Sequence, residues 1–242
     1  MSESRFRRSP VGAVALTGLV LALGGWGVLN SPMFATRRIV VHGTHHLTTS
    51  QVIDAAGVPS GENLVLLSTE EVAGKVEAIP WVVDAVAERD LPSAVVIRVV
   101  ERTAAGWFRD SQGVVVVARD GTVLERVDRR PDELPGLGPW SGVLEAGARI
   151  PTGESPLRVV ASMSGALRRM ISAGASTGSD VDLELRGGGT VQYGPPTRLS
   201  EKNAALVDIL DWASEEEIAV GTIDLRTPDA PTLHPASSQT DP

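Results

Sequence analysis

Three of the four histidines in this chain lie close together near its amino terminus, at His42, His45 and His46. Imidazole is the commonest metal-binding side chain in proteins, so the cluster raises the question of a metal centre. A zinc site needs three or four converging ligands, but the chain has neither an H-x-x-x-H spacing here nor any cysteine. The sequence therefore predicts histidines in a solvated turn, with no metal ligands and no cofactor.

Two other stretches have the residue types of catalytic motifs without their spacing. Gly187–Gly189 is glycine-rich like a phosphate-binding loop, yet such loops lead into a helix, and a strand is expected here. Ser200 and Lys202 are too close together for the S-x-x-K motif of penicillin-binding enzymes. The carboxylates are scattered, and cysteine nucleophiles are absent. We therefore expect no catalytic residues and no enzymatic activity, and a membrane-tethered hydrolase is the least favoured alternative.

The charge of the chain argues against nucleic acid as a partner. The formal net charge is −8 over 242 residues. Arg5, Arg7 and Arg8 against Glu3 give the first 30 residues a balance of +2, which leaves −10 for the rest. Nucleic-acid affinity comes largely from clustered basic side chains, and no basic stripe follows the amino terminus. The acidic remainder therefore favours other kinds of partner.

An uncharged segment near the amino terminus has the length of a membrane span. Nineteen residues from Val11 to Leu29 contain no charged side chain. A helix of that length covers roughly 28 Å, close to the hydrocarbon core of a bilayer. The alternative is a cleaved signal peptide, but its apolar region is usually shorter, and residues 31–35 match a cleavage site poorly. We therefore predict a transmembrane helix over residues 11–30.

The orientation of this span follows from the basic residues around it. Arg5, Arg7 and Arg8 precede the span, whereas only Arg37 and Arg38 follow it closely. Because positive charge is retained on the cytoplasmic side, we expect residues 1–10 to be cytoplasmic. The rest of the chain is then extracytoplasmic.

The region after the span has the pattern of a compact α+β unit. Residues 38–42 are rich in β-branched side chains and end at Gly43, which predicts a strand. Capping boxes that begin at Thr48 and Ser68 predict two helices. Two β-rich runs follow, joined by a turn at residues 90–93. The predicted order is β-α-α-β-β.

Several short motifs occur in order within this unit. They are Gly43, the loop from Gly57-Val58 to Asn63-Leu64, Pro80-Trp81, Arg89, Leu91-Pro92 and Glu101-Arg102. Together, just after a single span, they resemble the POTRA domain of the FtsQ/DivIB family of bacterial cell-division proteins. The resemblance implies a POTRA domain over residues 36–104. We expect Trp81 to pack in the core, because large aromatic side chains bury well.

Residues 105–228 have the pattern of a second, mostly antiparallel β domain with two helices. The predicted elements are strands at 114–118 and 122–126 around Asp120-Gly121, a helix over 156–174, strands at 181–185 and 190–193, a helix over 199–213 and a strand at 222–226. This arrangement resembles the second domain of the same family, with Lys202 and residues 223–226 as the best matches. Residues 229–242 have little to bury, and we predict a disordered tail.

The resemblance also implies a function. Family members are non-enzymatic scaffolds of the division machinery at the mid-cell septum, bound to FtsB/DivIC-type and FtsL-type membrane proteins and through them linked to septal peptidoglycan synthesis. In the family, the edge of the last strand accepts a strand from the FtsB-type partner. An alternative is a POTRA component of an export or assembly system that also binds peptide strands.

Carried onto this chain, the partner-binding strand runs from residue 222 to residue 226. Its residues are Thr222, Ile223, Asp224, Leu225 and Arg226. Arg226 is expected to pair with an acidic group of the partner. Lys202, on the preceding helix, either lines the same surface or is an ordinary solvent-exposed lysine. Some members carry an aromatic residue after the arginine, where this chain has Thr227. An aromatic anchor is therefore not expected, and the interface is expected to be weaker or differently centred.

Overall fold

The structure is a computed structural model that describes residues 18, 19, 23, 31–151 and 156–236. The chain forms two compact units, Met1–Glu101 and Arg102–Pro242. Most of the predicted membrane span, residues 11–30, lies outside the described residues, as does the predicted cytoplasmic segment. No helix in the described ranges has the length and apolar character needed to cross a bilayer.

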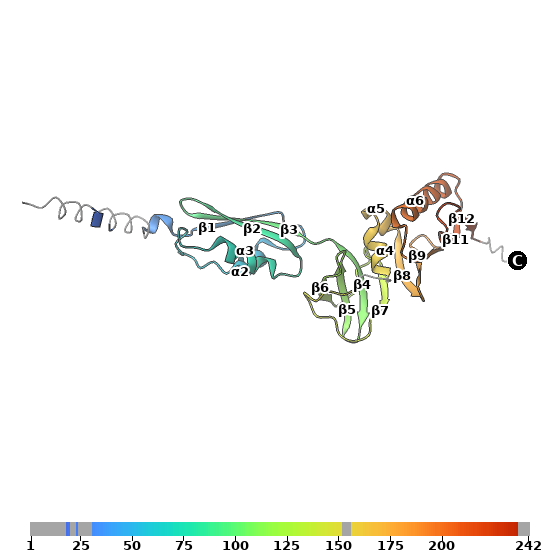
Figure 1. The fold of residues 1–242 in the computed structure, drawn as a ribbon, viewed down its shortest axis with the longest axis horizontal. Helices are drawn as coiled ribbons and strands as arrows, with labels where there is room; N and C mark the ends of the chain where they lie inside the picture. Colours follow the sequence, from blue (N-terminus) through green and yellow to red (C-terminus); the bar gives the residue numbers. More distant parts are fainter. Residues whose placement is uncertain (1–17, 20–22, 24–30, 152–155, 237–242) are drawn as a thin grey trace, which may run out of the picture. The chain divides into compact units, whose positions relative to one another are not determined.

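The first unit is a small α+β fold with the predicted β-α-α-β-β order. After a 3-10 turn, its elements are β1 (Arg38–His42), α2 (Thr49–Ala56), α3 (Thr69–Glu77), β2 (Val82–Asp90) and β3 (Ala94–Glu101). The strands lie in the order β1-β3-β2, with β1 parallel and β2 antiparallel to β3. Figure 1 shows α2 and α3 side by side against this sheet. Val52 of α2 and Val76 of α3 are completely buried in the same core as Ile97 of β3.

Local capping explains where the two helices begin. The Thr48 hydroxyl accepts a hydrogen bond from the Gln51 amide, and the Gln51 side chain accepts one from the Thr48 amide. Ser68 caps α3 through the amide of Glu71. Gly57 ends α2 in the left-handed conformation that glycine adopts without strain. Both predicted helix starts are confirmed.

Two charged side chains of the family motifs hold the loops of this unit. The Glu101 carboxylate accepts hydrogen bonds from the amides of His45, His46 and Leu47 at 2.8–3.0 Å. These bonds lower the pKa of Glu101 against the opposing effect of its burial. Arg89 donates from Nε to the Leu64 carbonyl at 2.7 Å. The motif residues therefore organise turns.

The histidine turn has a structural role that the sequence did not indicate. The His46 ring stacks on Trp81 with 3.6 Å between ring centroids. Trp81 packs against the core of the unit, as predicted, although it is only partly buried. His46 is therefore a packing residue and not only a solvated one.

The second unit is built on one long sheet. Its strands are β4 (Ala104–Asp110), β5 (Gly113–Ala118), β6 (Val123–Val127), β7 (Gly136–Pro139), β8 (Ile171–Thr177), β9 (Asp180–Leu185), β10 (Thr190–Gly194), β11 (Val220–Asp224) and β12 (Thr232–Pro235). Its helices are α4 (Pro156–Ser162), α5 (Gly165–Arg169) and α6 (Leu199–Glu215). The strand order is β12-β11-β10-β9-β8-β7-β4-β5-β6. The predicted hairpins β5–β6 and β9–β10 are both present.

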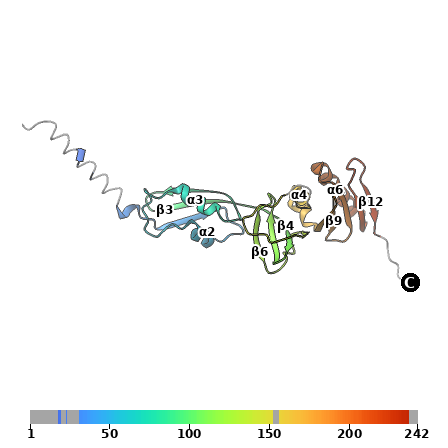
Figure 2. The same cartoon turned by 60° about the horizontal axis from the view of Figure 1, so that its bottom comes forward.

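The core of this unit lies between the sheet and its helices. Leu157 of α4 and Leu206 of α6 are completely buried in one cluster with Val191 and Ile223 of the sheet. Figure 2 shows α6 beside the β9 region, with β12 at the outer end of the row of strands. The helices thus cover one face of the sheet, and its opposite face carries the polar residues of β9 to β12.

The predicted helix over residues 156–174 is wrong in its second half. Ser164 adopts an extended conformation and caps a new short helix through the Leu167 amide, so α4 and α5 are separate. The chain then enters β8, which pairs with β9 along its whole length. Apolar residues at helical spacing extended the prediction to Met170, which is 44% exposed. Residues 171–177 are mostly small, and they form a strand that lies between two other strands of the sheet.

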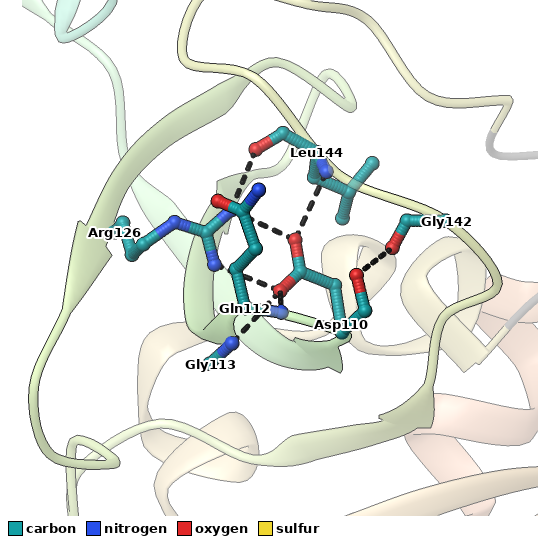
Figure 3. Close-up of polar contacts among 7 residues, drawn as sticks. Asp110, Gln112, Gly113, Arg126, Gly142 and Leu144 are labelled. Atoms are coloured by element: carbon teal, nitrogen blue, oxygen red, sulfur yellow. Dashed lines mark hydrogen bonds and ion pairs between the residues drawn. The ribbon is translucent and has the colours of Figure 1, made fainter.

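A buried carboxylate ties the β4–β5 turn to the rest of the second unit (Figure 3). Asp110 forms a bidentate ion pair with Arg126 of β6, with both distances at 2.8 Å. It also accepts the amides of Leu144 at 2.9 Å, Gln112 at 2.8 Å and Gly113 at 3.0 Å. Arg126 first, and then the Leu144 amide, hold the pKa of Asp110 well below its usual range.

Candidate functional site

The strand predicted to accept a partner is not at the edge of the sheet. β11 pairs in parallel with β10, where Ile223 lies opposite Val191, and antiparallel with β12, where Ile223 lies opposite Leu233. Both ladders use the backbone of β11. The assignment of the open edge to residues 222–226 is therefore corrected, because a further strand covers it.

That further strand comes from the segment predicted to be disordered. β12 comprises residues 232–235, and the Ala236 amide donates to the Ala219 carbonyl at 2.8 Å. Leu233 packs against the core of the unit, whereas Thr232 and His234 are exposed. One apolar residue on the inner face is enough to hold a strand whose backbone pairs with β11. The prediction of a disordered tail is thus wrong for these residues.

The signal for β12 was present but weak. Residues 232–234 alternate polar, apolar and polar, the period of a half-buried strand. Pro231 and Pro235 flank them, and proline is tolerated in a sheet mainly at edge strands. The disordered interpretation followed from the few apolar residues of this segment, whereas the flanking prolines are typical of an edge strand.

Two rows of side chains cross the open face of the sheet at its β12 end. Register places Thr190, Thr222 and His234 in one row. The adjacent row contains Gln192, Asp224 and Thr232. The predicted residues Thr222 and Asp224 therefore lie on this polar face, while Ile223 and Leu225 point into the core and are fully buried. A partner bound to this polar face would contact Thr222 and Asp224 but not Ile223 and Leu225.

Arg226 already has an acidic partner within the chain. Its guanidinium pairs with the Asp224 carboxylate at 2.5 Å. This pairing lowers the pKa of Asp224 and raises that of Arg226. Both groups are partly exposed, so the pair is weak in energy and open to exchange with another charged group.

A second arginine positions the turn that leads into β12. Arg198, at the start of α6, holds both oxygens of Asp229 at 2.8 Å and also pairs with Glu201. The Asp229 and Glu201 hydrogen bonds raise the pKa of Arg198. Because Asp229 lies between β11 and β12, this clamp orients the chain as it enters the edge strand.

Lys202, predicted as a neighbour of the partner-binding strand, is buried. Its side chain is 1% exposed, and Nζ donates to the carbonyls of Tyr193 at 2.7 Å and Pro195 at 2.8 Å. Nζ also lies 5.0 Å from the Tyr193 ring centroid. Burial lowers the pKa of Lys202. The ammonium group thus closes the end of β10, which is a structural role.

Replacing Lys202 with methionine or alanine is expected to reduce the stability of the second unit by about 2–4 kcal/mol, because two carbonyls lose their donor. Denaturant unfolding measures this effect. Once folded, the Lys202→Met variant should retain full partner binding. Loss of partner binding with unchanged stability would instead return Lys202 to the interface.

A family model described as "POTRA domain, FtsQ-type" matches residues 34–102. The chain is 30% identical to the cell division protein FtsQ of Streptomyces coelicolor over 208 residues, which cover 81% of the chain and 79% of that protein. It is 28% identical to FtsQ of Mycobacteroides abscessus over 216 residues, 88% of the chain and 66% of that protein. Against FtsQ of Mycobacterium tuberculosis the identity is 29% over 223 residues, 90% of the chain and 68% of the relative.

These matches and the β-α-α-β-β unit define a POTRA-containing protein with a large β domain. The chain spans about two thirds of the length of the mycobacterial relatives. Within that class, the chain belongs to the FtsQ family of cell-division proteins.

Proposed function

We propose that this protein is a non-enzymatic scaffold of the division machinery at mid-cell. One span at residues 11–30 anchors it, with both folded units extracytoplasmic. Its family and the POTRA unit support this role. It binds FtsB/DivIC-like and FtsL-like membrane proteins and connects them to septal peptidoglycan synthesis.

The partner of FtsB type binds by adding a strand to β12. This single observation supports the mechanism: β12 is the terminal strand of a nine-stranded sheet, and only its β11 side is paired within the part of the chain that the structure describes. Free backbone N–H and C=O groups along such an edge supply affinity for an extended peptide. The exposed side chains of Thr232 and His234 supply selectivity.

β12 is a short edge strand, which limits the number of backbone hydrogen bonds that an added strand can form with it. β12 has four residues, and Pro235 has no N–H. Because alternate residues of a strand direct their backbone groups to opposite sides, only one or two residues offer a donor outward. Because so few donors are available, strand addition fixes the register of the partner. A ladder this short supplies limited affinity, so additional contacts are needed for high affinity.

The absence of native cysteine makes the edge directly testable. A single cysteine at Thr232 or His234, labelled with a photo-crosslinker, is expected to capture the FtsB-like protein of the same cell. Both side chains are exposed, so the labels leave the core intact. Immunoblotting of the crosslinked product identifies the partner.

A matched label at the opposite edge of the same sheet is the control. Val127 of β6 lies at that edge, and a cysteine there should give no adduct with the partner. Equal crosslinking from β6 and β12, or none from β12 in cells that contain the partner, would refute strand addition at β12.

A further inference from the structure

An apolar hollow of about 430 Å³ lies in the second unit, where the end of α6 meets the β9–β10 turn and the start of β11. Its apolar lining residues are Met170, Leu185, Leu210, Ala213, Ile218 and Val220. We call it the Met170 hollow. Met170 is 44% exposed there. The hollow therefore has room and chemistry for one apolar side chain.

Two arginines form one rim of the Met170 hollow. Arg186 is fixed by a hydrogen bond from Nε to the Arg169 carbonyl at 2.7 Å, and its Nη groups make no hydrogen bond to a described residue. The Arg169 guanidinium likewise has no ion pair or hydrogen bond within the described ranges. Both side chains are exposed. Their donors are available to an incoming carboxylate, which a guanidinium binds through two hydrogen bonds.

A third arginine, Arg168, precedes Arg169 in the chain and does not line the hollow itself. Arg168 is 8% exposed, and its Nη1 is buried with no hydrogen-bond partner. Burial lowers its pKa first, and the neighbouring charges of Arg119 and Arg169 lower it further. No carboxylate pairs with these arginines among the described residues, so an anion is favoured beside them.

The Met170 hollow reaches the start of β11, the strand that pairs with the proposed binding edge. Val220, in its lining, pairs with Pro235 of β12. Ala219, also in its lining, accepts the Ala236 amide. A peptide added to β12 therefore lies two strand spacings, about 10 Å, from these residues of the hollow.

We propose that the Met170 hollow is a second anchor for the same partner chain: it takes an apolar side chain next to a carboxylate, from the segment that flanks the added strand. This inference rests on the proposed strand addition at β12. Residues 237–242 of the chain itself follow β12 but include no large apolar side chain, so they are poorly suited to fill the hollow. The carboxylate pairs with Arg169 and Arg186, and the apolar group covers Met170.

The ligand chemistry is tested by NMR of methionine methyl groups, because the chain has only four methionines. The purified full chain is titrated with acetyl-Asp-Leu-Phe-Glu-amide and with acetyl-Asn-Leu-Phe-Gln-amide. The acidic peptide should shift the Met170 signal and leave Met33, in the other unit, unchanged. The neutral peptide should bind about tenfold more weakly or worse. Equal binding of the two peptides would overturn the arginine rim.

Variants locate the effect on the arginines. Arg169→Gln and Arg186→Gln should each weaken the acidic peptide about tenfold. Arg149→Gln is the matched control, an exposed arginine whose ion pair with Asp120 lies away from the hollow lining. Unchanged affinity in both rim variants contradicts the proposal.

Crosslinking from the hollow separates this inference from the proposed function. Ser214 lines the hollow and is exposed, so a labelled Ser214→Cys variant should capture the FtsB-like protein as Thr232→Cys does. Capture from position 232 alone refutes the second anchor and leaves strand addition standing. Capture from neither position refutes both, and capture from 214 alone refutes strand addition.

Discussion

Replacing Gly43 with alanine is expected to destabilise the first unit by about 3 kcal/mol or more. Gly43 has a φ of +88°, and a Cβ there would lie 2.1 Å from the Val99 carbonyl oxygen. The obstacle is backbone of β3, which also pairs with β1 and cannot shift cheaply. Two costs therefore add: strain of the backbone and separation of two paired strands.

Gly61→Ala is the matched control for this prediction. Gly61 has a similar φ of +85°, but nothing lies within 4 Å of a Cβ built there. Its substitution should cost only the backbone strain, about 1–2 kcal/mol. Denaturant unfolding of the two variants separates the costs. Equal losses of stability would show that the contact with Val99 is unimportant.

Replacing Asp110 with asparagine is expected to lower the melting temperature of the second unit by about 5–10 °C at neutral pH. Asparagine keeps the shape but removes the charge that Arg126 faces. It also replaces one acceptor oxygen with an NH2 donor, which then faces the N–H groups that donate to Asp110. The turn, β6 and the residue 142–144 loop then lose their common anchor.

This effect should depend on pH in a defined direction. The pKa of Asp110 is lowered in the folded state from its ordinary value of 3.8. The ionised carboxylate therefore stabilises the fold above about pH 4, and this contribution is lost as the pH falls through the lower folded-state pKa. The difference between wild type and Asp110→Asn should shrink below pH 4 in thermal unfolding. Asp208→Asn, on the exposed face of α6, should show no such effect. A difference that is constant with pH would contradict the ion pair.

The first unit was predictable because its signals are local. Thr48 with Gln51 and Ser68 with Glu71 fix helix starts within four residues, and each contact is present. Glu101 was identified by motif alone. Its three amide partners lie more than 50 residues away in sequence, so only the fold reveals why it is there.

The second unit was less predictable because its decisive contacts are distant or ambiguous. Apolar spacing suits either a helix or a strand in residues 171–177, and pairing with β9 decides for the strand. From the sequence alone, Lys202 is expected at the surface. In the structure its ammonium group donates to the carbonyls of Tyr193 and Pro195. β12 is stabilised by β11 and one apolar contact, which no short window of sequence contains. The candidate edge was therefore misplaced by one strand.

The junction between β7 and β8 has a mechanical consequence. Gly136 opposite Ala173 is the single residue pair that joins these strands in the described part of the chain. Helix α4 contacts β4 on one side of the junction and β8 and β9 on the other. Tension applied at β12 by a membrane-anchored partner would thus pass to β4 both through β7 and through the packing of α4. The unit resists such a pull by packing at its centre and by hydrogen bonds on either side.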